Sequence, residues 1–104
     1  MGMFDFLKPV TTQQSVEPGT LLVVEDMFEL QNVGPVVVGI ASALITKGQT
    51  AAIRSGESEI PVVIAGIEKL GQQTDTCQAG DPVGLVLQNV QFSQIAQGDC
   101  IMAA

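Results

Sequence analysis

The sequence has 104 residues, enough for one domain with its own hydrophobic core, and 46% of its residues are apolar. Eleven acidic residues against four basic ones give a net charge of −7, and His is absent. The negative charge disfavours binding to nucleic-acid phosphates, and the lack of His excludes Ser-His and Cys-His nucleophile pairs. The sequence has no secretory leader pattern and no apolar run of membrane-spanning length, so we expect a cytoplasmic protein.

The first 19 residues differ in character from the rest of the chain. Residues 1–9 place apolar side chains at helical spacing before Pro9 interrupts the pattern, and residues 10–19 are polar and end in Glu-Pro-Gly. We expect residues 1–19 to be an arm or linker, either flexible or laid on the domain through Phe4 and Phe6. A docking peptide or a weakly membrane-touching peptide is the alternative for residues 1–9. Residues 20–104 then form a single domain.

From residue 20 onward, apolar runs of strand length alternate with turn residues, a pattern typical of all-β domains. In residues 83–88 the side chains of Val83, Leu85 and Leu87 share one face, and Gly39 inside another apolar run marks a bulge or a close backbone approach. Residues 92–96 have room for one helical turn, and Asp81 is expected to cap a turn. The expected strands are 21–25, 27–32, 36–45, 50–53, 60–70, 83–88 and 100–103, with loops at 55–59 and 71–76.

These features predict a small closed antiparallel β-barrel of about six to seven strands with one short helical turn. Closure removes the exposed sheet edges that so many apolar strands would otherwise present.

Several stretches resemble the second domain, a small β-barrel, of elongation factor Tu-type translational GTPases. The family's Val-Glu-Asp-Val-Phe run resembles residues 24–28, and its Ala-Gly-Asp-Asn-Val-Gly run resembles residues 79–84. Further similarities lie at residues 34–40, 46–49 and 97–99, in the family's order and with compatible spacing. The resemblance implies a translation-factor barrel and a link to RNA or the aminoacyl end of tRNA.

The sequence also departs from that family. The GxxxxGK[ST] motif that holds nucleotide phosphates is missing, so we expect no GTP binding and a barrel that stands alone. Ile40 occupies the position of a family Arg. If RNA binding is retained, the residues expected to carry it are Lys47, Arg54 and Lys69.

Cysteine and acidic residues give little indication of catalysis or metal binding. Cys77 and Cys100 are expected to be small core residues, although a reactive Cys77 thiol would be the basis of an enzyme. Glu57 and Glu59 could approach a cation, but a solvated loop is the simpler interpretation. We expect no catalytic residue, cofactor or metal. Glu25 and Asp26 are adjacent and would point to opposite faces of a strand.

The leading hypothesis is a non-catalytic binding module whose partner is another protein or a second copy of the chain. Its expected contact residues are Gln88, Gln91, Gln94 and Gln97, which recur every three residues. Low charge reduces the cost of desolvating such a surface, although neutral drift would also explain the glutamines. The alternatives are an RNA or tRNA-end binding domain and, with the least support, a Cys77-dependent enzyme.

Overall fold

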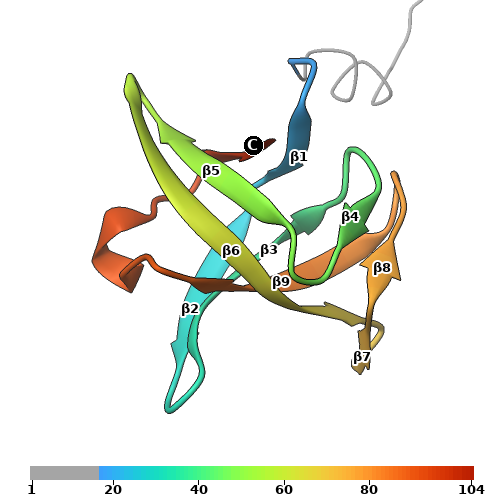
Figure 1. Ribbon diagram of the computed structural model, residues 1–104. Coiled ribbons are helices and arrows are strands. Elements are labelled where there is room, and N and C mark those ends of the chain that lie inside the picture. Colours follow the sequence, from blue (N-terminus) through green and yellow to red (C-terminus); the bar gives the residue numbers. More distant parts are fainter. Residues whose placement is uncertain (1–16) are drawn as a thin grey trace, which may run out of the picture.

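The computed structural model describes residues 17–104, which form ten strands and one short 3-10 helix. Eight strands make one antiparallel sheet in the order β1-β10-β5-β6-β9-β3-β2, with β7 paired to β6, while β4 pairs with β8 (Figure 1). The elements are β1 (Thr20–Val23), β2 (Asp26–Leu30), β3 (Gly34–Ile40), β4 (Ile45–Thr46), β5 (Thr50–Ser55), β6 (Ser58–Lys69), β7 (Gln72–Thr74), β8 (Thr76–Cys77), β9 (Pro82–Gln88), η1 (Phe92–Gln94) and β10 (Cys100–Ala103). The predicted all-β antiparallel fold is confirmed.

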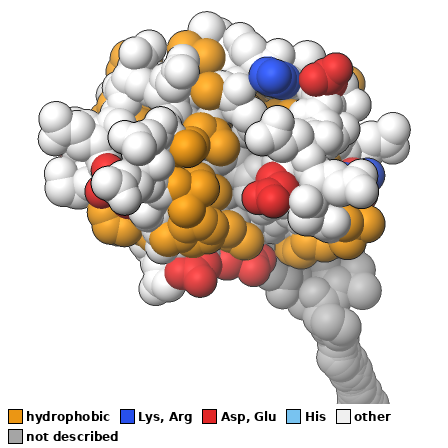
Figure 2. All heavy atoms as spheres, turned by 90° about the horizontal axis from the view of Figure 1, so that it is seen from below, with side chains coloured by type: hydrophobic (Ala, Val, Ile, Leu, Met, Phe, Trp, Pro, Cys, Tyr) orange, Lys and Arg blue, Asp and Glu red, His pale blue; other side chains and the backbone are white. Residues whose placement is uncertain are grey.

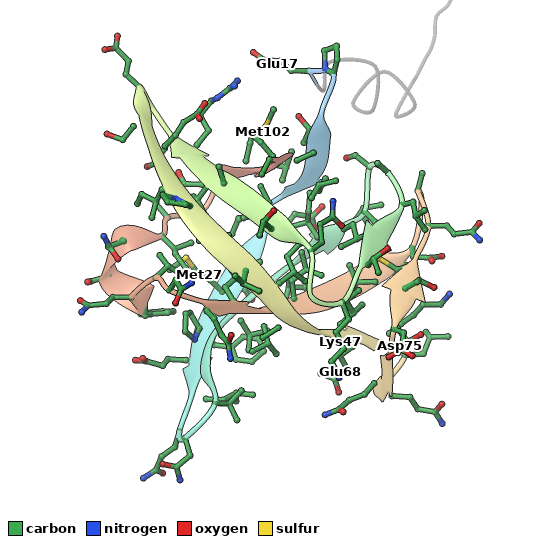
Figure 3. The ribbon with its side chains drawn as sticks, in the orientation of Figure 1. Glu17, Met27, Lys47, Glu68, Asp75 and Met102 are labelled. Carbon is green, nitrogen blue, oxygen red and sulfur yellow. The ribbon has the colours of Figure 1, made fainter. Side chains whose placement is uncertain are left out.

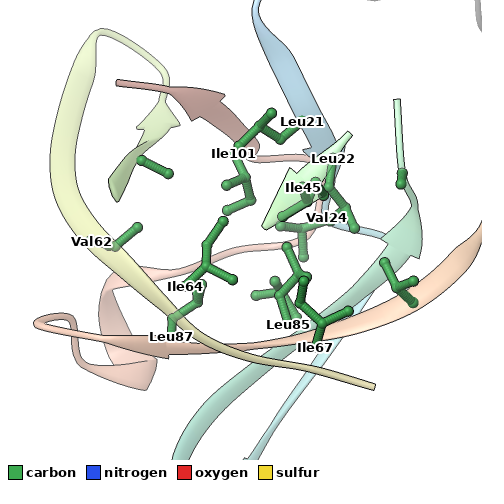
Figure 4. Close-up of a cluster of buried hydrophobic side chains, with 14 of the residues drawn as sticks. Leu21, Leu22, Val24, Ile45, Val62, Ile64, Ile67, Leu85, Leu87 and Ile101 are labelled. Atoms are coloured by element: carbon green, nitrogen blue, oxygen red, sulfur yellow. The ribbon is translucent and has the colours of Figure 1, made fainter. Parts of the chain in front are cut away.

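The hydrophobic core lies on the inner face of the curved sheet. Val83, Leu85 and Leu87 on β9 are at most 3% exposed, which confirms the predicted alternation. They pack with buried side chains from β1, β4, β5, β6 and β10 (Figure 4). These neighbours include Leu21, Leu22, Ile45, Ile53, Val62, Ile64, Ile67 and Ile101.

Strand β1, at one end of the strand order, approaches the end of β3. A single bridge joins Leu22 to Ala41, beyond the last residue of β3. A Cβ atom on Gly39 would lie 2.4 Å from the carbonyl oxygen of Val23, which confirms the close backbone approach expected there. No continuous ladder between β1 and β3 is present in residues 17–104, so closure into a barrel stays a prediction.

The expected strand 36–45 is wrong as a single element, because β3 ends at Ile40 and β4 begins at Ile45. Between them the chain leaves the β3–β9 ladder: the N–H of Ala41 donates to the carbonyl of Asp81, and the N–H of Ser42 donates to that of Leu21, both at 2.8 Å. These bonds satisfy the backbone without a continuous strand.

Two expected loops are also shorter than the sequence indicated. The stretch 71–76 contains β7, which folds back onto the end of β6, and the start of β8, which pairs with β4. The tip between β5 and β6 is reduced to Gly56 and Glu57, because both strands extend further than their apolar residues do. These two short strands, together with the division of the expected strand 36–45 into β3 and β4, account for the ten strands found where six to seven were expected.

The predicted helical turn is confirmed as η1, where the N–H of Gln91 donates to Oε1 of Gln94 at 2.9 Å. No helix in residues 17–104 has the length and apolar character needed to cross a membrane. The proposed packing of Phe4 and Phe6, like most of the expected arm 1–19, lies outside the described residues. The division into an arm and one domain remains a prediction.

Candidate interaction surface

The outer face of β2, β3, β9 and β6 carries an apolar groove of about 370 Å³. Seen from below, hydrophobic side chains form a continuous area on this side of the molecule, with acidic side chains at its border (Figure 2). Lys47 and Glu68 are the only charged residues in the groove lining, which consists of Leu30, Val33, Val36, Lys47, Ala65, Gly66, Ile67, Glu68, Gln73, Gly84 and Val86.

Strand register builds the apolar wall of this groove. Val36 on β3 lies opposite Phe28 on β2 and also opposite Val86 on β9, and Val86 lies opposite Gly66 on β6. Because side chains alternate along a strand and Leu85 points into the core, Val86 and its row face outward. The row runs across four strands, of which only β2 and β3 are consecutive in the sequence.

Two glycines leave the groove open. A Cβ atom on Gly66 would lie 3.5 Å from Cγ2 of Val86, and one on Gly84 would lie 3.5 Å from Cγ1 of Val36. Both distances are ordinary van der Waals contacts, so neither site needs glycine to avoid a clash. The missing side chains therefore create space on the outer face.

The β2–β3 hairpin extends the apolar area beyond the sheet. Phe28 and Leu30 are each 43% exposed and Val33 at the turn is 51% exposed. The turn is stabilised by a 3.1 Å hydrogen bond from the N–H of Val33 to the carbonyl of Leu30, and Asn32 adopts a φ of 67°. Exposed apolar side chains at a hairpin tip are a common feature of contact surfaces.

The four predicted contact glutamines are all exposed, but none lines the groove. Gln88 ends β9, Gln91 and Gln94 lie at η1, and Gln97 lies in the following turn. The side chain of Gln94 is engaged in closing η1 through its bond to Gln91. The structure thus brings Gln91 and Gln94 together and gives Gln94 a local structural role.

The three basic residues considered for RNA binding do not form one cluster. Arg54 lies opposite Glu59 near the start of β6, whereas Lys69 ends β6. These positions are ten residues apart along β6, about 30 Å measured along the chain. Lys47 lines the groove and is drawn near Glu68 and Asp75 (Figure 3).

Two of these basic residues form ion pairs. The Arg54 guanidinium bonds to the carboxylates of Glu17 and Glu59, and these contacts raise the pKa of Arg54. Lys69 Nζ lies 3.1 Å from Oδ2 of Asp81. Their charge is therefore largely compensated within the chain.

Asp81 caps a turn, as the sequence predicted. Its Oδ2 accepts a hydrogen bond from the N–H of Gln78 at 2.8 Å, in addition to the Lys69 contact. The Gln78 bond and then the Lys69 bond lower the pKa of the Asp81 carboxyl. This carboxylate ties the end of β6 to the turn before β9.

The two cysteines are free, with Cys77 buried and Cys100 half-buried. Burial, followed by the nearby charge of Asp81, raises the pKa of the Cys77 thiol, which disfavours the nucleophilic thiolate. Glu59 is engaged with Arg54, and residues 17–104 contain no group of three or more His, Cys, Asp or Glu side chains placed to hold a metal ion.

No known protein-family profile matches the sequence. The structure is nevertheless similar to that of translation elongation factor SelB from Methanococcus maripaludis in its apo form, with a TM-score of 0.70 and 20% sequence identity over 90% of this chain. The chain shares the fold of a part of this translation factor. It spans 22% of the length of the SelB chain, and the similarity confirms the fold resemblance seen in the sequence.

Proposed function

We propose that this chain is a non-catalytic, translation-factor-like β-module that binds another protein through the groove on its outer face. The observation that carries the proposal is the apolar row from Phe28 to Gly66, which continues into the exposed tip at Leu30 and Val33. An apolar centre with a charged border is the usual composition of a protein interface. The proposed setting is the cytoplasm.

Charge and geometry favour a protein over RNA as the partner. The net charge is −7, and the carboxylates of Glu17, Glu59 and Asp81 already compensate Arg54 and Lys69. RNA affinity needs several unpaired cations that converge on the phosphates. The burial of Cys77 and the raised pKa of its thiol likewise favour a binding role over a thiol-dependent enzyme.

We also propose that the sheet closes into a barrel, with β1 against β3. The bridge between Leu22 and Ala41 and the close approach of Gly39 to Val23 support this arrangement. Closure would leave β2 as a flap on the outside of the barrel, next to the groove.

The test is capture of partners from an extract of the protein's own cells with the tagged chain, read by mass spectrometry. Leu30→Glu places a charge at the groove wall, and Leu44→Glu makes the same change at a residue that is 60% exposed and outside the groove lining. Each capture is carried out with and without nuclease.

A protein that is retained after nuclease treatment, lost with Leu30→Glu and kept with Leu44→Glu would support the proposal. If the unaltered chain and both variants retained this protein equally, the groove would not be the binding site. Retained material that disappears with nuclease would favour the RNA hypothesis instead.

A further inference from the structure

Strand β2 is an open edge of the sheet. It is last in the strand order and pairs only with β3 among residues 17–104. Four of its five residues are exposed, including the large apolar side chains of Phe28 and Leu30. An exposed edge strand presents unpaired backbone groups to which another chain can add as a further strand.

The position of Pro35 determines which backbone groups face this edge. Glu29 lies opposite Pro35, which has no N–H, so this pair cannot be one of the hydrogen-bonded pairs that alternate along an antiparallel ladder. The N–H and C=O of Glu29 therefore point away from β3. By the same alternation, those of Met27 do so as well.

An independent contact agrees with this orientation. The N–H of Met27 donates to Oδ1 of Asp26 at 2.8 Å, in a contact that is exposed to solvent. A side chain thus occupies an edge donor that β3 does not use. Glu29 retains a donor and an acceptor that no described protein group satisfies, and Met27 retains its acceptor.

A strand added at this edge would continue the surface described above. Phe28 and Leu30 stand on the same face of β2, because they are two residues apart, and Phe28 belongs to the row that contains Val36 and Val86. Every second side chain of the added strand would extend that row. The backbone bonds and the apolar groove would therefore act together.

The charges beside the edge select the incoming strand. Glu25, Asp26 and Glu29 lie on β2 or directly before it, and this segment has no basic residue. A second copy of this chain would bring three further carboxylates alongside them, and like charges on adjacent strands are destabilising. Lys or Arg side chains would be favoured at these positions.

Building on the proposed function, we propose that the partner contributes an extended segment of alternating apolar and basic residues, which adds to β2 as an antiparallel or parallel strand. Its backbone pairs with Met27 and Glu29, its apolar side chains lie beside Phe28 and Leu30, and its basic side chains approach the carboxylates. The hydrogen bond from the N–H of Met27 to the Asp26 side chain breaks when the strand binds.

The probe is the synthetic peptide Thr-Lys-Val-Arg-Val-Lys-Thr, titrated into the ¹⁵N-labelled full chain and followed by NMR. We expect saturable shifts and at least ten-fold slower hydrogen exchange at the Met27 and Glu29 amides. Two control peptides keep the length: one replaces every basic residue with Glu, and the other carries N-methyl groups at alternate amides. Both should bind at least ten-fold more weakly.

Protein variants test the same point. Glu29→Pro removes the edge donor without removing a β2–β3 hydrogen bond and should weaken peptide binding at least ten-fold. Glu29→Lys should weaken it several-fold, whereas Glu57→Lys, the same charge change at the β5–β6 tip, should not. If Glu29→Pro does not fold, the N-methylated peptide still tests the backbone pairing in the unaltered protein.

Three results would overturn the inference: no shift at the β2 amides, equal binding of the N-methylated peptide, or dimerisation of the chain that Glu29→Pro abolishes. The first two would leave the proposed function intact if Leu30→Glu still released the captured protein. If Leu30→Glu did not release the captured protein while the peptide still bound at β2, the result would instead contradict the groove as the binding site.

Discussion

Two hairpins of the same sheet differ in composition at their tips: one tip is polar and the other is apolar. The β5–β6 hairpin ends in Ser55, Gly56, Glu57 and Ser58, and β5 is paired on both sides, with β10 and with β6. The β2–β3 hairpin ends in apolar side chains at Leu30 and Val33, and β2 is paired on one side only. Figure 1 shows the two hairpins projecting at opposite ends of the molecule.

This difference distinguishes the residues that folding requires from those that contact with a partner would require. The polar tip between β5 and β6 shows that a hairpin of this sheet forms without exposed apolar residues, because its strands are stabilised by burial further along. The apolar tip between β2 and β3 adds little to the core, since Leu30 is 43% exposed. Its composition is therefore best explained by contact with a partner, as proposed above.

The largest contrast is expected in stability. Ile53 on β5 is fully buried, so Ile53→Ala should lower the free energy of unfolding by about 2–5 kcal/mol. Leu30→Ala, at a half-exposed position of β2, should cost less than about 1 kcal/mol. Denaturant titration of both variants measures the two values. Equal losses would mean that the β2–β3 tip is part of the core.

The next effect compares two glycines on neighbouring strands of the groove sheet. Gly39→Ala forces a Cβ atom against the carbonyl of Val23 at 2.4 Å, so the backbone must move, and we expect a loss of about 1–3 kcal/mol. Gly84→Ala makes ordinary contacts and should be neutral or stabilising by up to about 1 kcal/mol. Denaturant titration of the two variants and of the unaltered protein measures both changes in the free energy of unfolding.

The same Gly84→Ala chain sharpens the functional side of the comparison, because it narrows the groove without unfolding the protein. Partner retention that falls in this variant would agree with a groove that needs its open floor. Destabilisation as large as that of Gly39→Ala would show that Gly84 has a backbone role.

Much of the fold was predictable because its determinants are local. The alternation of Val83, Leu85 and Leu87 follows from the two-residue period of a strand, and Gly39 interrupts a β-branched run where only glycine fits. The short strands β7 and β8 were missed because they are only three and two residues long and contain a single core residue, Cys77. Their pairing with β6 and β4 depends on tertiary position rather than on hydrophobic pattern.

The groove could not be predicted from the sequence. Its row joins Phe28, Val36, Val86 and Gly66 through three separate strand registers, and register is not visible in a single sequence. The two-residue period of the expected strand 27–32 places Phe28 and Leu30 on one face, but it does not determine which face is solvated. The spacing of the glutamines instead predicted a contact surface around η1, where Gln94 closes a turn.

A smaller effect is expected at the polar hairpin. Arg54→Gln removes the ion pairs with Glu17 and Glu59, which lie in solvent, so we expect a slight decrease in the thermal midpoint at low ionic strength. The difference from the unaltered protein should disappear in about 1 M salt, where the screening length is about 3 Å. A decrease that persists at high salt would show that the Arg54 side chain stabilises the hairpin by packing.

The smallest effect concerns Asp81, which links the end of β6 to the turn before β9. The N–H of Gln78 and the ammonium group of Lys69 hold the pKa of this carboxyl below its ordinary value of 3.8 in the folded protein. A depressed folded-state pKa favours the folded state above the ordinary pKa, and this contribution is lost as the pH falls through the folded-state value.

Asp81→Asn should therefore be slightly less stable than the unaltered protein at neutral pH, since the amide can still accept the Gln78 hydrogen bond but cannot pair with Lys69. Thermal midpoints of both chains measured from about pH 7 to about pH 2.5 should converge below the ordinary Asp pKa. A difference that stays constant or grows on acidification would mean that the carboxylate charge does not stabilise this corner, and that the turn depends on the shape of the side chain alone.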